Sequence, residues 1–311
     1  MPLKLAVVGV GKIARDQHLP VIAANPQIEL VAAANRSGPV KGVRTFASLA
    51  ELLDACPEVE AVSLCTPPLG RALDARRAIA RGIHVLLEKP PAATLSAVAD
   101  LAGRAEAAGV TLFASWHSRF APRAADAKAW LRGRRVRAVE ITWLEDVRVW
   151  HPGQAWIFAA GGMGVFDPGI NAISLATDIL PEAFSLTQGR LTFPANRQAP
   201  IAAQLAFEDV NGAPIRAELD FLHAGEPRWD IAVDTDAGRL LLSKGGAEMG
   251  VDGEPAAPAA LPGPHPEYTP LYAHFLRLIA EGRSDVDVSP LRHVADAFML
   301  GEREEGPAFD F

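Results

Sequence analysis

One lysine occupies a position at which side chains often meet ligands. Lys89 lies in the run Leu87-Glu88-Lys89-Pro90-Pro91, directly after an apolar stretch that predicts a buried strand. In open α/β sheets, ligands bind beyond the carboxyl ends of the parallel strands, and a proline forces the residue before it into an extended conformation. We therefore expect the Lys89 amine to meet a bound small molecule, where it could accept or donate a proton.

A glycine-rich turn near the N-terminus predicts a phosphate site. Gly9-Val10-Gly11-Lys12-Ile13-Ala14 follows the first apolar run and opens an amphipathic one. The first glycine permits a tight turn, the second lets a pyrophosphate approach main-chain N–H groups, and Ala14 keeps the helix close to the strand. In this context the motif predicts dinucleotide binding by Gly9, Gly11, Lys12 and Ile13, against the alternative of a simple strand-to-helix turn.

The end of the second apolar run predicts which dinucleotide is preferred. A carboxylate there would accept a hydrogen bond from the ribose of NAD and repel the 2′-phosphate of NADP. The sequence instead reads Asn35-Arg36-Ser37, which offers a guanidinium and a hydroxyl. We expect NADP to be preferred and NAD to remain usable, unless Arg36 is only a solvated loop charge.

A second polar pair follows a glycine-rich segment later in the chain. Asp167 directly precedes Pro168, which suits the first turn of a helix, and the i, i+4 spacing of Asp167 and Asn171 puts both on one helix face. An alternative is that Asp167 only caps the helix and Asn171 is a surface residue.

The elements that must position these residues form two groups. Up to about Trp116, short apolar runs alternate with Ala-rich amphipathic runs, which predicts a doubly wound parallel sheet of the Rossmann type. The expected strands are 3–8, 28–34, 61–65, 84–87 and 111–115, and the expected helices are 12–25, 48–55, 69–81 and 94–108. We interpret Arg71, Arg76, Arg77 and Arg81 as a solvated helix face.

Beyond about Arg123, strand-like runs follow one another. They predict an α+β domain with a largely antiparallel open sheet from 136–144, 184–193, 201–207, 215–221, 229–233 and 239–242. Helices are expected at 124–131, 168–180, 270–281 and 290–300, with a loop over Gly250–Pro266. We expect a dinucleotide-binding domain over residues 1–121 and a substrate-binding and oligomerisation domain over 122–311.

Composition narrows the function classes. The 311 residues are 49% hydrophobic and 22% charged, as in folded globular chains, and the net charge of −7 disfavours nucleic acid or an anionic membrane surface as a partner. The two cysteines, Cys56 and Cys65, show no disulfide framework and no zinc spacing, so no metal is expected. No apolar stretch is long enough to span a bilayer, and we expect a cytoplasmic protein.

Together these motifs resemble the Gfo/Idh/MocA family of oxidoreductases. The resemblance rests on Gly9, Gly11 and Ala14, on Cys65-Thr66-Pro67-Pro68, on Glu88-Lys89-Pro90 and on the segment from Gly161 to Asn171. It runs over essentially the whole chain. Many family members carry histidine where Asn171 stands, and asparagine cannot relay a proton, so the acid/base role is expected to lie with Lys89 and Asp167.

More narrowly, the sequence is similar to the bacterial aldose 1-dehydrogenases of this family. The resemblance implies that Lys89, Asp167 and Asn171 are catalytic, and that Cys65, Thr66, Pro67, Pro68, Glu88 and Lys89 line the cofactor. It implies a sugar site that contains, besides the three catalytic residues, His117, Glu145, Trp150, His151, Trp156 and Trp229. Five of the six tryptophans lie between residues 116 and 156, which favours a stacking wall for a sugar ring.

The implied reaction is oxidation of C1 of a pyranose, with L-arabinose or D-galactose favoured, to the aldonolactone with NADP or NAD. The implied partners are a small neutral sugar and a second copy of the chain. Alternatives are a family member that acts on inositol, on a dihydrodiol or on another sugar, and a non-catalytic dinucleotide-binding regulator. His18, which precedes Leu19 and Pro20, either contacts the cofactor or caps the helix kink.

Overall fold

The N-terminal sheet forms where the short apolar runs predict it. In the computed structural model, which describes residues 1–261 and 263–311, six parallel strands pair in the order β3-β2-β1-β4-β5-β6. The strands are β1 (Leu3–Val8), β2 (Ile28–Ala34), β3 (Thr45–Phe46), β4 (Ala61–Leu64), β5 (His84–Glu88) and β6 (Leu112–Ser115). The order reverses beside β1, so the turns after β1 and β4 meet at the edge where such folds bind ligands.

The helices of this region mostly match the predicted ranges. They are α1 (Leu19–Ala24), preceded by a π-helical turn at Ala14–His18, then α2 (Leu49–Ala55), α3 (Pro68–Ile79) and α4 (Leu95–Ala108). Thr94 caps α4 by accepting from the N–H of Ala97, and Gly109 ends it in the left-handed conformation. The helix expected over 12–25 is confirmed as a helical run over residues 12–24, within which residues 14–18 form a π-helical turn.

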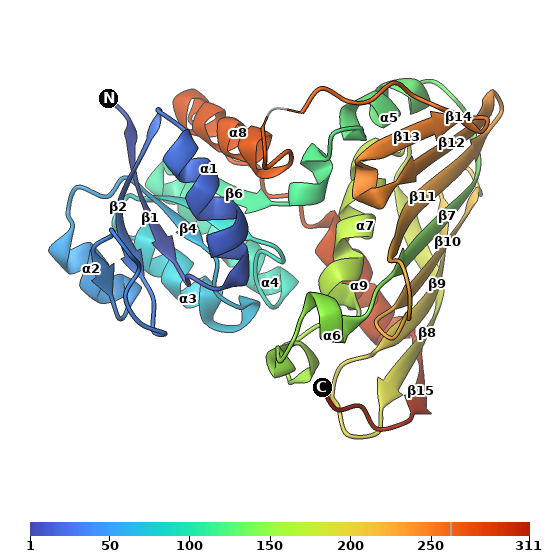
Figure 1. Cartoon of the computed structure of the whole chain (residues 1–311), viewed down its shortest axis with the longest axis horizontal. Helices are drawn as coiled ribbons and strands as arrows, with labels where there is room; N and C mark the ends of the chain where they lie inside the picture. Colours follow the sequence, from blue (N-terminus) through green and yellow to red (C-terminus); the bar gives the residue numbers. More distant parts are fainter. Residues whose placement is uncertain (262) are drawn as a thin grey trace. The chain divides into compact units, whose positions relative to one another are not determined.

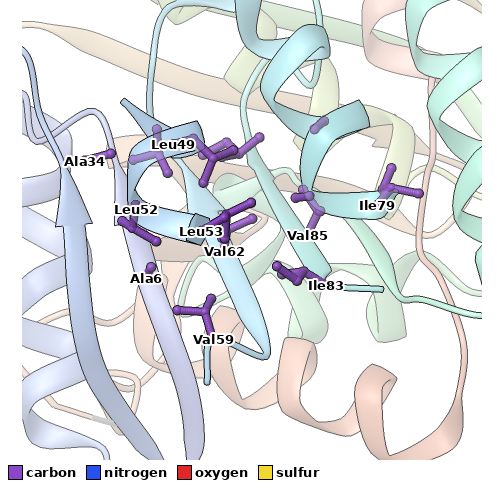
Figure 2. Close-up of a cluster of buried hydrophobic side chains, with 14 of the residues drawn as sticks. Ala6, Ala34, Leu49, Leu52, Leu53, Val59, Val62, Ile79, Ile83 and Val85 are labelled. Atoms are coloured by element: carbon purple, nitrogen blue, oxygen red, sulfur yellow. The ribbon is translucent and has the colours of Figure 1, made fainter. Parts of the chain in front are cut away.

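An apolar core fixes the helices on the sheet. Figure 2 shows Leu49, Leu52 and Leu53 of α2 packed toward Ala6 of β1 and Val62 of β4. Burial of such side chains contributes about 1.5–3 kcal/mol each, which is what holds α2 in place. The turns that carry the glycine motif and Lys89 are therefore anchored by strands with a solid core.

The second sheet has nine strands in the order β14-β13-β12-β11-β7-β10-β9-β8-β15. All pairs are antiparallel except β10 with β7 and β15 with β8, so the predicted fold class is confirmed. The strands are β7 (Val136–Leu144), β8 (Phe184–Pro194), β9 (Ala202–Asp209), β10 (Pro214–Asp220), β11 (Arg228–Thr235), β12 (Gly238–Ser243), β13 (Glu248–Val251), β14 (Glu254–Pro255) and β15 (Glu302–Gly306).

The helices of this second region pack on one face of the sheet. They are α5 (Ala124–Leu131), the short α6 (Val147–Trp150), α7 (Phe166–Ile179) and α9 (Ser289–Leu300). Helix α7 contacts α9, β7 and β11, and Figure 1 shows α7 and α9 on the same side of the sheet. On β9 and β10 buried and exposed residues alternate, as expected for a sheet with one covered face.

The chain divides into two compact units, and a helix from the C-terminal part of the sequence belongs to the unit of the N-terminal sheet. Unit 1 comprises Met1–His117 and Pro262–Val288, and unit 2 comprises Ser118–Leu261 and Ser289–Phe311. Helix α8 (Tyr268–Glu281) therefore belongs to the unit of the parallel sheet, where it contacts α1 (Figure 1). The predicted division after residue 121 places all later residues in the second domain and so does not include the return of 262–288 to unit 1. As a boundary between cofactor and substrate domains it stays a prediction.

Three further differences concern short elements. Strand β3 has two residues and β15 is highly charged, so neither shows the apolar alternation that predicts a strand. The loop expected over 250–266 was partly wrong, because β13 and β14 form a hairpin there; position 262 of that loop lies outside the described residues.

In the described part of the chain, no helix combines the length and apolar character that a membrane span requires.

Candidate active site

The glycine turn has the close packing that its motif predicts. Gly9 follows β1 with φ +84°, and a Cβ there would lie 2.7 Å from the Thr66 side chain, in the turn after β4. A Cβ at Gly11, in contrast, would meet no atom within 4 Å. Glycine at position 9 thus lets two turns of the chain touch, while Gly11 leaves its main chain open to a ligand.

Thr66 adds a polar atom to the same turn. Its Oγ1 is buried and has no hydrogen-bond partner among the described residues. A buried hydroxyl without a partner is costly unless a ligand or water supplies one. The residues around Gly9 therefore fit a phosphate or hydroxyl group of a dinucleotide. Cys65 and Pro67 flank Thr66, and Pro68 is the first residue of α3.

Lys12 and Ile13 lie on the surface of the turn, and Lys12 pairs with Asp16 one helical turn later. Residues 35–37 follow β2, as predicted. The Asn35 side-chain amide donates to the carbonyl of Gly38 at 2.8 Å, which stabilises the turn, whereas Arg36 and Ser37 are exposed. Arg36 thus projects from a turn held by Asn35.

Arg71 is not part of a solvated face, so that prediction was wrong. Its side chain is buried, its Nε donates to the Thr66 carbonyl at 2.9 Å, and its Nη1 contacts the carbonyls of Glu88 and Pro90. The cause is local: Gly70 has φ +93° and interrupts α3, so Arg71 starts its regular part, where side chains tilt toward the helix N-terminus. Arg71 therefore links the turns after β4 and β5.

Lys89 follows β5, as expected from the strand pattern. Its main-chain N–H donates to Oε2 of the preceding Glu88 at 2.7 Å, and the bond from Lys89 to Pro90 is cis. The other oxygen of Glu88, Oε1, accepts from the Tyr268 hydroxyl at 2.6 Å and lies 3.1 Å from Nε2 of His18. Glu88 is thus a buried carboxylate, directly before the lysine, with hydrogen-bond donors on both of its oxygens.

The charges of this network compensate one another. Burial favours the neutral form of Glu88, but hydrogen bonds and charge from His18, with His117 and Tyr268, lower the pKa of Glu88 to about 2. Burial likewise disfavours the charged His18, yet Cys65, Tyr272 and Glu88 raise the pKa of His18 well above its usual value. These shifts favour an imidazolium at His18 against an ionised carboxylate at Glu88.

That assignment satisfies every donor and acceptor. Glu88 can only accept when ionised, so Nε2 of His18 donates to it. Nδ1 of His18 lies 2.8 Å from the Tyr272 hydroxyl, which lies 2.9 Å from Oγ of Ser63. With His18 charged, Nδ1 donates to Tyr272, and Tyr272 donates to Ser63. His18 is therefore an internal residue of the unit, at the junction of the π-turn and α1, and its ring nitrogens bond to the protein.

His117 is the last residue of the first stretch of unit 1, Met1–His117. Its side chain is oriented by Glu267 and Tyr268, which belong to the second stretch of the same unit. Its Nδ1 lies 2.6 Å from Oε2 of Glu267, and its ring stacks on Tyr268 with centroids 5.4 Å apart. Because an ionised carboxylate only accepts, Nδ1 of His117 carries the hydrogen. Sequence reasoning missed Glu267, Tyr268 and Tyr272, since no local motif marks them.

In unit 2, the predicted Glu145, His151 and Trp229 come together. Glu145 follows β7, and its Oε2 accepts from the indole N–H of Trp229 on β11 at 2.9 Å. His151 Nε2 lies 3.3 Å from Glu145 Oε1, within ion-pair distance. That contact is not aligned as a hydrogen bond, so Oε1, buried with the rest of Glu145, has no hydrogen-bond partner in the described structure.

Asp167 and Asn171 lie on α7, as predicted. Asp167 is buried in the first turn of the helix, but Val165 is the N-cap residue, so Asp167 does not act as the cap. Oδ2 of Asp167 lies 3.9 Å from Nδ1 of His151, which places that imidazole between two carboxylates. Asn171 follows one turn later and is half-buried. The sharp approach to α7 needs Gly164, where a Cβ would collide with the carbonyl oxygen of Pro200.

The tryptophans separate into different environments. Trp229 contacts Trp150 edge-on, with centroids 4.9 Å apart, and Trp143, with centroids 6.0 Å apart. Trp150 is 42% exposed and Trp156 is 36% exposed, so both present ring surface to solvent. Trp116 is buried in unit 1, and Trp130 packs under Arg134. The set around Trp229 forms a cluster within unit 2, which adds Trp143 to the predicted residues.

In the part of the chain that the structure describes, no group of three or more His, Cys, Asp or Glu side chains could hold a metal ion. The residues that sequence analysis assigns to the site therefore comprise two sets. One set surrounds the turns after β1, β4 and β5 in unit 1, and the other surrounds Glu145, His151 and Asp167 in unit 2.

Known proteins resemble the chain over its whole length. Residues 3–115 match the Gfo/Idh/MocA family, an oxidoreductase family with an NAD-binding Rossmann fold. Galactose 1-dehydrogenase of Pseudomonas fluorescens is 45% identical over 308 residues, covering 99% of each chain. The crystal structure of a D-galactose-1-dehydrogenase from Rhizobium etli superposes with a TM-score of 0.94 at 52% identity, covering 99% of this chain and 98% of that one.

A more distant structure shares the fold. KijD10, a 3-ketoreductase from Actinomadura kijaniata solved with NADP and TDP-benzene, gives a TM-score of 0.85 at 19% identity, with 99% of this chain and 100% of that chain covered. At this level of identity the likeness concerns the fold alone.

Proposed function

The chain belongs to the Gfo/Idh/MocA family of oxidoreductases, and we propose that it is an NAD(P)-dependent aldose 1-dehydrogenase. It oxidises C1 of a cyclic sugar to the aldonolactone, and D-galactose is the first candidate substrate. The observation that carries the proposal is the identity of 45% and 52% to two galactose 1-dehydrogenases over nearly the full chain. L-Arabinose is the second candidate because it shares the ring stereochemistry of D-galactose through C4.

The cofactor is assigned to unit 1. The turn at Gly9 and Gly11, the buried Thr66 hydroxyl without a partner and the open space at Gly11 fit a dinucleotide pyrophosphate. When bound, the nicotinamide accepts the hydride that leaves C1 of the sugar. We assign Lys12, Ile13, Cys65, Pro67 and Pro68 to the same cofactor, as the resemblance implies.

NADP is the preferred form in this proposal. No carboxylate follows β2 to repel a 2′-phosphate, and the exposed Arg36 can pair with that phosphate while Ser37 donates a hydrogen bond. Asn35 is bound to its own turn and sets the position of Arg36. NAD remains a usable acceptor because the pyrophosphate site does not depend on Arg36.

The protein must remove the O1 proton as the hydride leaves. Lys89, at the end of β5, and Asp167, at the start of α7, are the two candidates for this base. Asn171 can only donate and accept hydrogen bonds, so it orients a sugar hydroxyl. Either base serves the same balance: C1 loses a hydride, O1 loses a proton, and a C1 carbonyl forms.

We assign recognition of the sugar to polar groups that can form further hydrogen bonds. Glu145 Oε1 has no hydrogen-bond partner in the described structure, and its neighbour His151 adds a donor. Trp229, Trp150 and Trp156 supply aromatic faces that suit the apolar side of a pyranose, and His117 is a further hydrogen-bonding group. A hydroxyl that fills the capacity of Glu145 distinguishes epimers, since the wrong epimer leaves the carboxylate unpaired.

The expected partners are this sugar, the dinucleotide and a second copy of the chain. The homodimer is what the family resemblance implies, and the face of the sheet formed by the exposed residues of β9 and β10 is the surface that we assign to it. Light scattering on the purified protein measures the dimer directly. Residence in the cytoplasm stays a prediction.

A spectrophotometric panel tests the proposed function. The purified enzyme is mixed with NADP or NAD and with D-galactose, L-arabinose, D-xylose, D-glucose or myo-inositol, and absorbance of the reduced cofactor is followed. We expect the fastest reduction with D-galactose or L-arabinose, and faster reduction of NADP than of NAD. Activity with myo-inositol alone, or with none of the compounds, would overturn the proposal.

A further inference from the structure

The two tyrosines of the chain lie one turn apart on α8, and the proposed function uses neither. Tyr268 and Tyr272 are both buried in unit 1. Each hydroxyl is bonded inside the unit, Tyr268 to Glu88 and Tyr272 to His18 and Ser63. Burying a hydroxyl is tolerated only with a partner, so these contacts hold α8 in a defined register on the parallel sheet.

Glu88 connects helix α8 to the main chain of Lys89, because its carboxylate bonds to both. Its Oε1 takes two donors, from Tyr268 at 2.6 Å and His18 at 3.1 Å, while its Oε2 accepts the Lys89 N–H at 2.7 Å. Rotation of the carboxylate would break all three contacts. The orientation of Glu88 therefore fixes the peptide group from which the Lys89 side chain starts.

The main-chain carbonyls on either side of Lys89 are held by a different residue, Arg71. Arg71 donates to the carbonyls of Glu88 and Pro90, on either side of Lys89. The main chain around Lys89 is thus bonded at its N–H by one charged group and at the flanking carbonyls by another. Such duplicate support suits a side chain whose position must be accurate within a fraction of an ångström.

We propose that Tyr268 and His18 are positioning residues, which act through the Glu88 carboxylate to hold the main chain of Lys89 for proton transfer. This inference rests on the proposed function, in which Lys89 is one of the two candidate bases for the O1 proton. It gives the returning helix α8 a role in the reaction that sequence order conceals. His18 supplies the charge that keeps Glu88 ionised, and Tyr268 supplies the bond that sets its orientation.

The variant Tyr268→Phe removes one donor to Glu88 and keeps the ring. We expect kcat to fall about ten- to a hundredfold, because a misplacement of about 1 Å in a reacting group has effects of that size. We expect the dissociation constant of NADP, measured by tryptophan fluorescence, to stay within about twofold, because the Gly9 turn keeps its own contacts.

The matched control is Tyr272→Phe. It removes an equally buried hydroxyl from the same helix, but one that bonds to His18 and Ser63 instead of Glu88. Urea denaturation reports how much stability each variant loses. Hydrogen exchange of the Lys89 amide, followed by NMR or mass spectrometry, reports the bond from Lys89 to Glu88 without any need for turnover.

The proposal expects faster Lys89 amide exchange and lower kcat in Tyr268→Phe than in Tyr272→Phe. Wild-type exchange in Tyr268→Phe, or a larger effect in Tyr272→Phe than in Tyr268→Phe, would overturn it. If Tyr268→Phe does not fold, Glu88→Gln replaces it: one carboxamide oxygen cannot serve both Tyr268 and Lys89, so the same acceleration is expected. A wild-type enzyme that oxidises no sugar would overturn the proposed function, while amide exchange would still decide this inference.

Discussion

Two buried carboxylates, one in each unit, differ in how completely their own unit satisfies them. Glu88 in unit 1 accepts from Tyr268, His18 and the Lys89 N–H, which occupy both of its oxygens. Glu145 in unit 2 is as deeply buried, yet only its Oε2 has a hydrogen-bond donor, Trp229. A carboxylate with both oxygens bonded inside the protein has less capacity left for a ligand than one with an oxygen that has no hydrogen-bond donor.

The comparison gives the two carboxylates different roles, a structural one for Glu88 and a ligand-binding one for Glu145. Glu88 is a structural anion whose pKa is held at about 2 by its partners. Glu145 shares His151 with Asp167, so two carboxylates compete for one imidazole. We infer that unit 1 is organised before any ligand arrives, and that the polar groups of unit 2 are completed by the sugar.

The largest predicted effect separates the two candidate bases. Lys89→Ala removes the amine of unit 1, and kcat should fall by about a thousandfold, in the range that loss of a general base produces. NADP binding, measured by fluorescence titration, should be nearly unchanged. Asp167→Asn is the isosteric counterpart in unit 2, and whichever variant loses more of the rate at its pH optimum carries the base. Near-normal turnover in both variants would contradict the mechanism.

The next prediction concerns stability. Glu88→Ala leaves the buried His18 without its anion, and the free energy of unfolding should fall by about 3–5 kcal/mol. Glu145→Ala should lose only about 1–2 kcal/mol, because it leaves one indole N–H unpaired, but it should raise KM for the sugar by about tenfold or more. Urea denaturation and steady-state kinetics measure the two effects. Equal losses of stability would remove the distinction between the carboxylates.

Acidity tests the same distinction. The pKa of Glu88 falls from its ordinary 4.5 to about 2 on folding, so its contribution is complete above about pH 4.5 and is lost as the pH falls toward 2. The loss amounts to about 3 kcal/mol. The raised pKa of His18 acts in the opposite direction: its contribution is complete below about 6.5 and declines as the pH rises through the folded value. Urea unfolding of wild type and Glu88→Gln across this range should differ most near neutral pH and converge in acid.

The smallest effect is expected at the surface of unit 1. Arg36→Ala should lower kcat/KM for NADP by about tenfold and leave that for NAD within about twofold, because only the 2′-phosphate loses a partner. Parallel assays with both cofactors measure the ratio. An unchanged ratio would show that Arg36 is only a solvated charge.

Local patterns were sufficient for much of this structure. The turn at Gly9 and the position of Lys89 follow from strand ends, whose apolar runs are long enough to be recognised. Glu145 was assigned only through the family resemblance, since an isolated acidic residue carries no local signal, whereas Asp167 was singled out by its spacing to Asn171. Strand β3 was missed because two residues show no alternation.

The contacts that the sequence could not predict are those between distant segments. Tyr268 lies 180 residues from Glu88, and Tyr272 lies 254 residues from His18. Nothing in the amphipathic pattern of α8 indicates that it packs on the parallel sheet. Arg71 was misassigned because helix periodicity does not reveal the interruption at Gly70, which redirects its side chain.

Transfer of the hydrogen on C1 tests the central claim most directly. D-Galactose carrying deuterium at C1 is incubated with the enzyme and NADP, and the reduced cofactor is examined by mass spectrometry and NMR. The account predicts deuterium on the nicotinamide C4, a slower rate with the labelled sugar when hydride transfer limits turnover, and the aldonolactone as product. Reduced cofactor without deuterium would mean that another carbon is oxidised and would contradict the account.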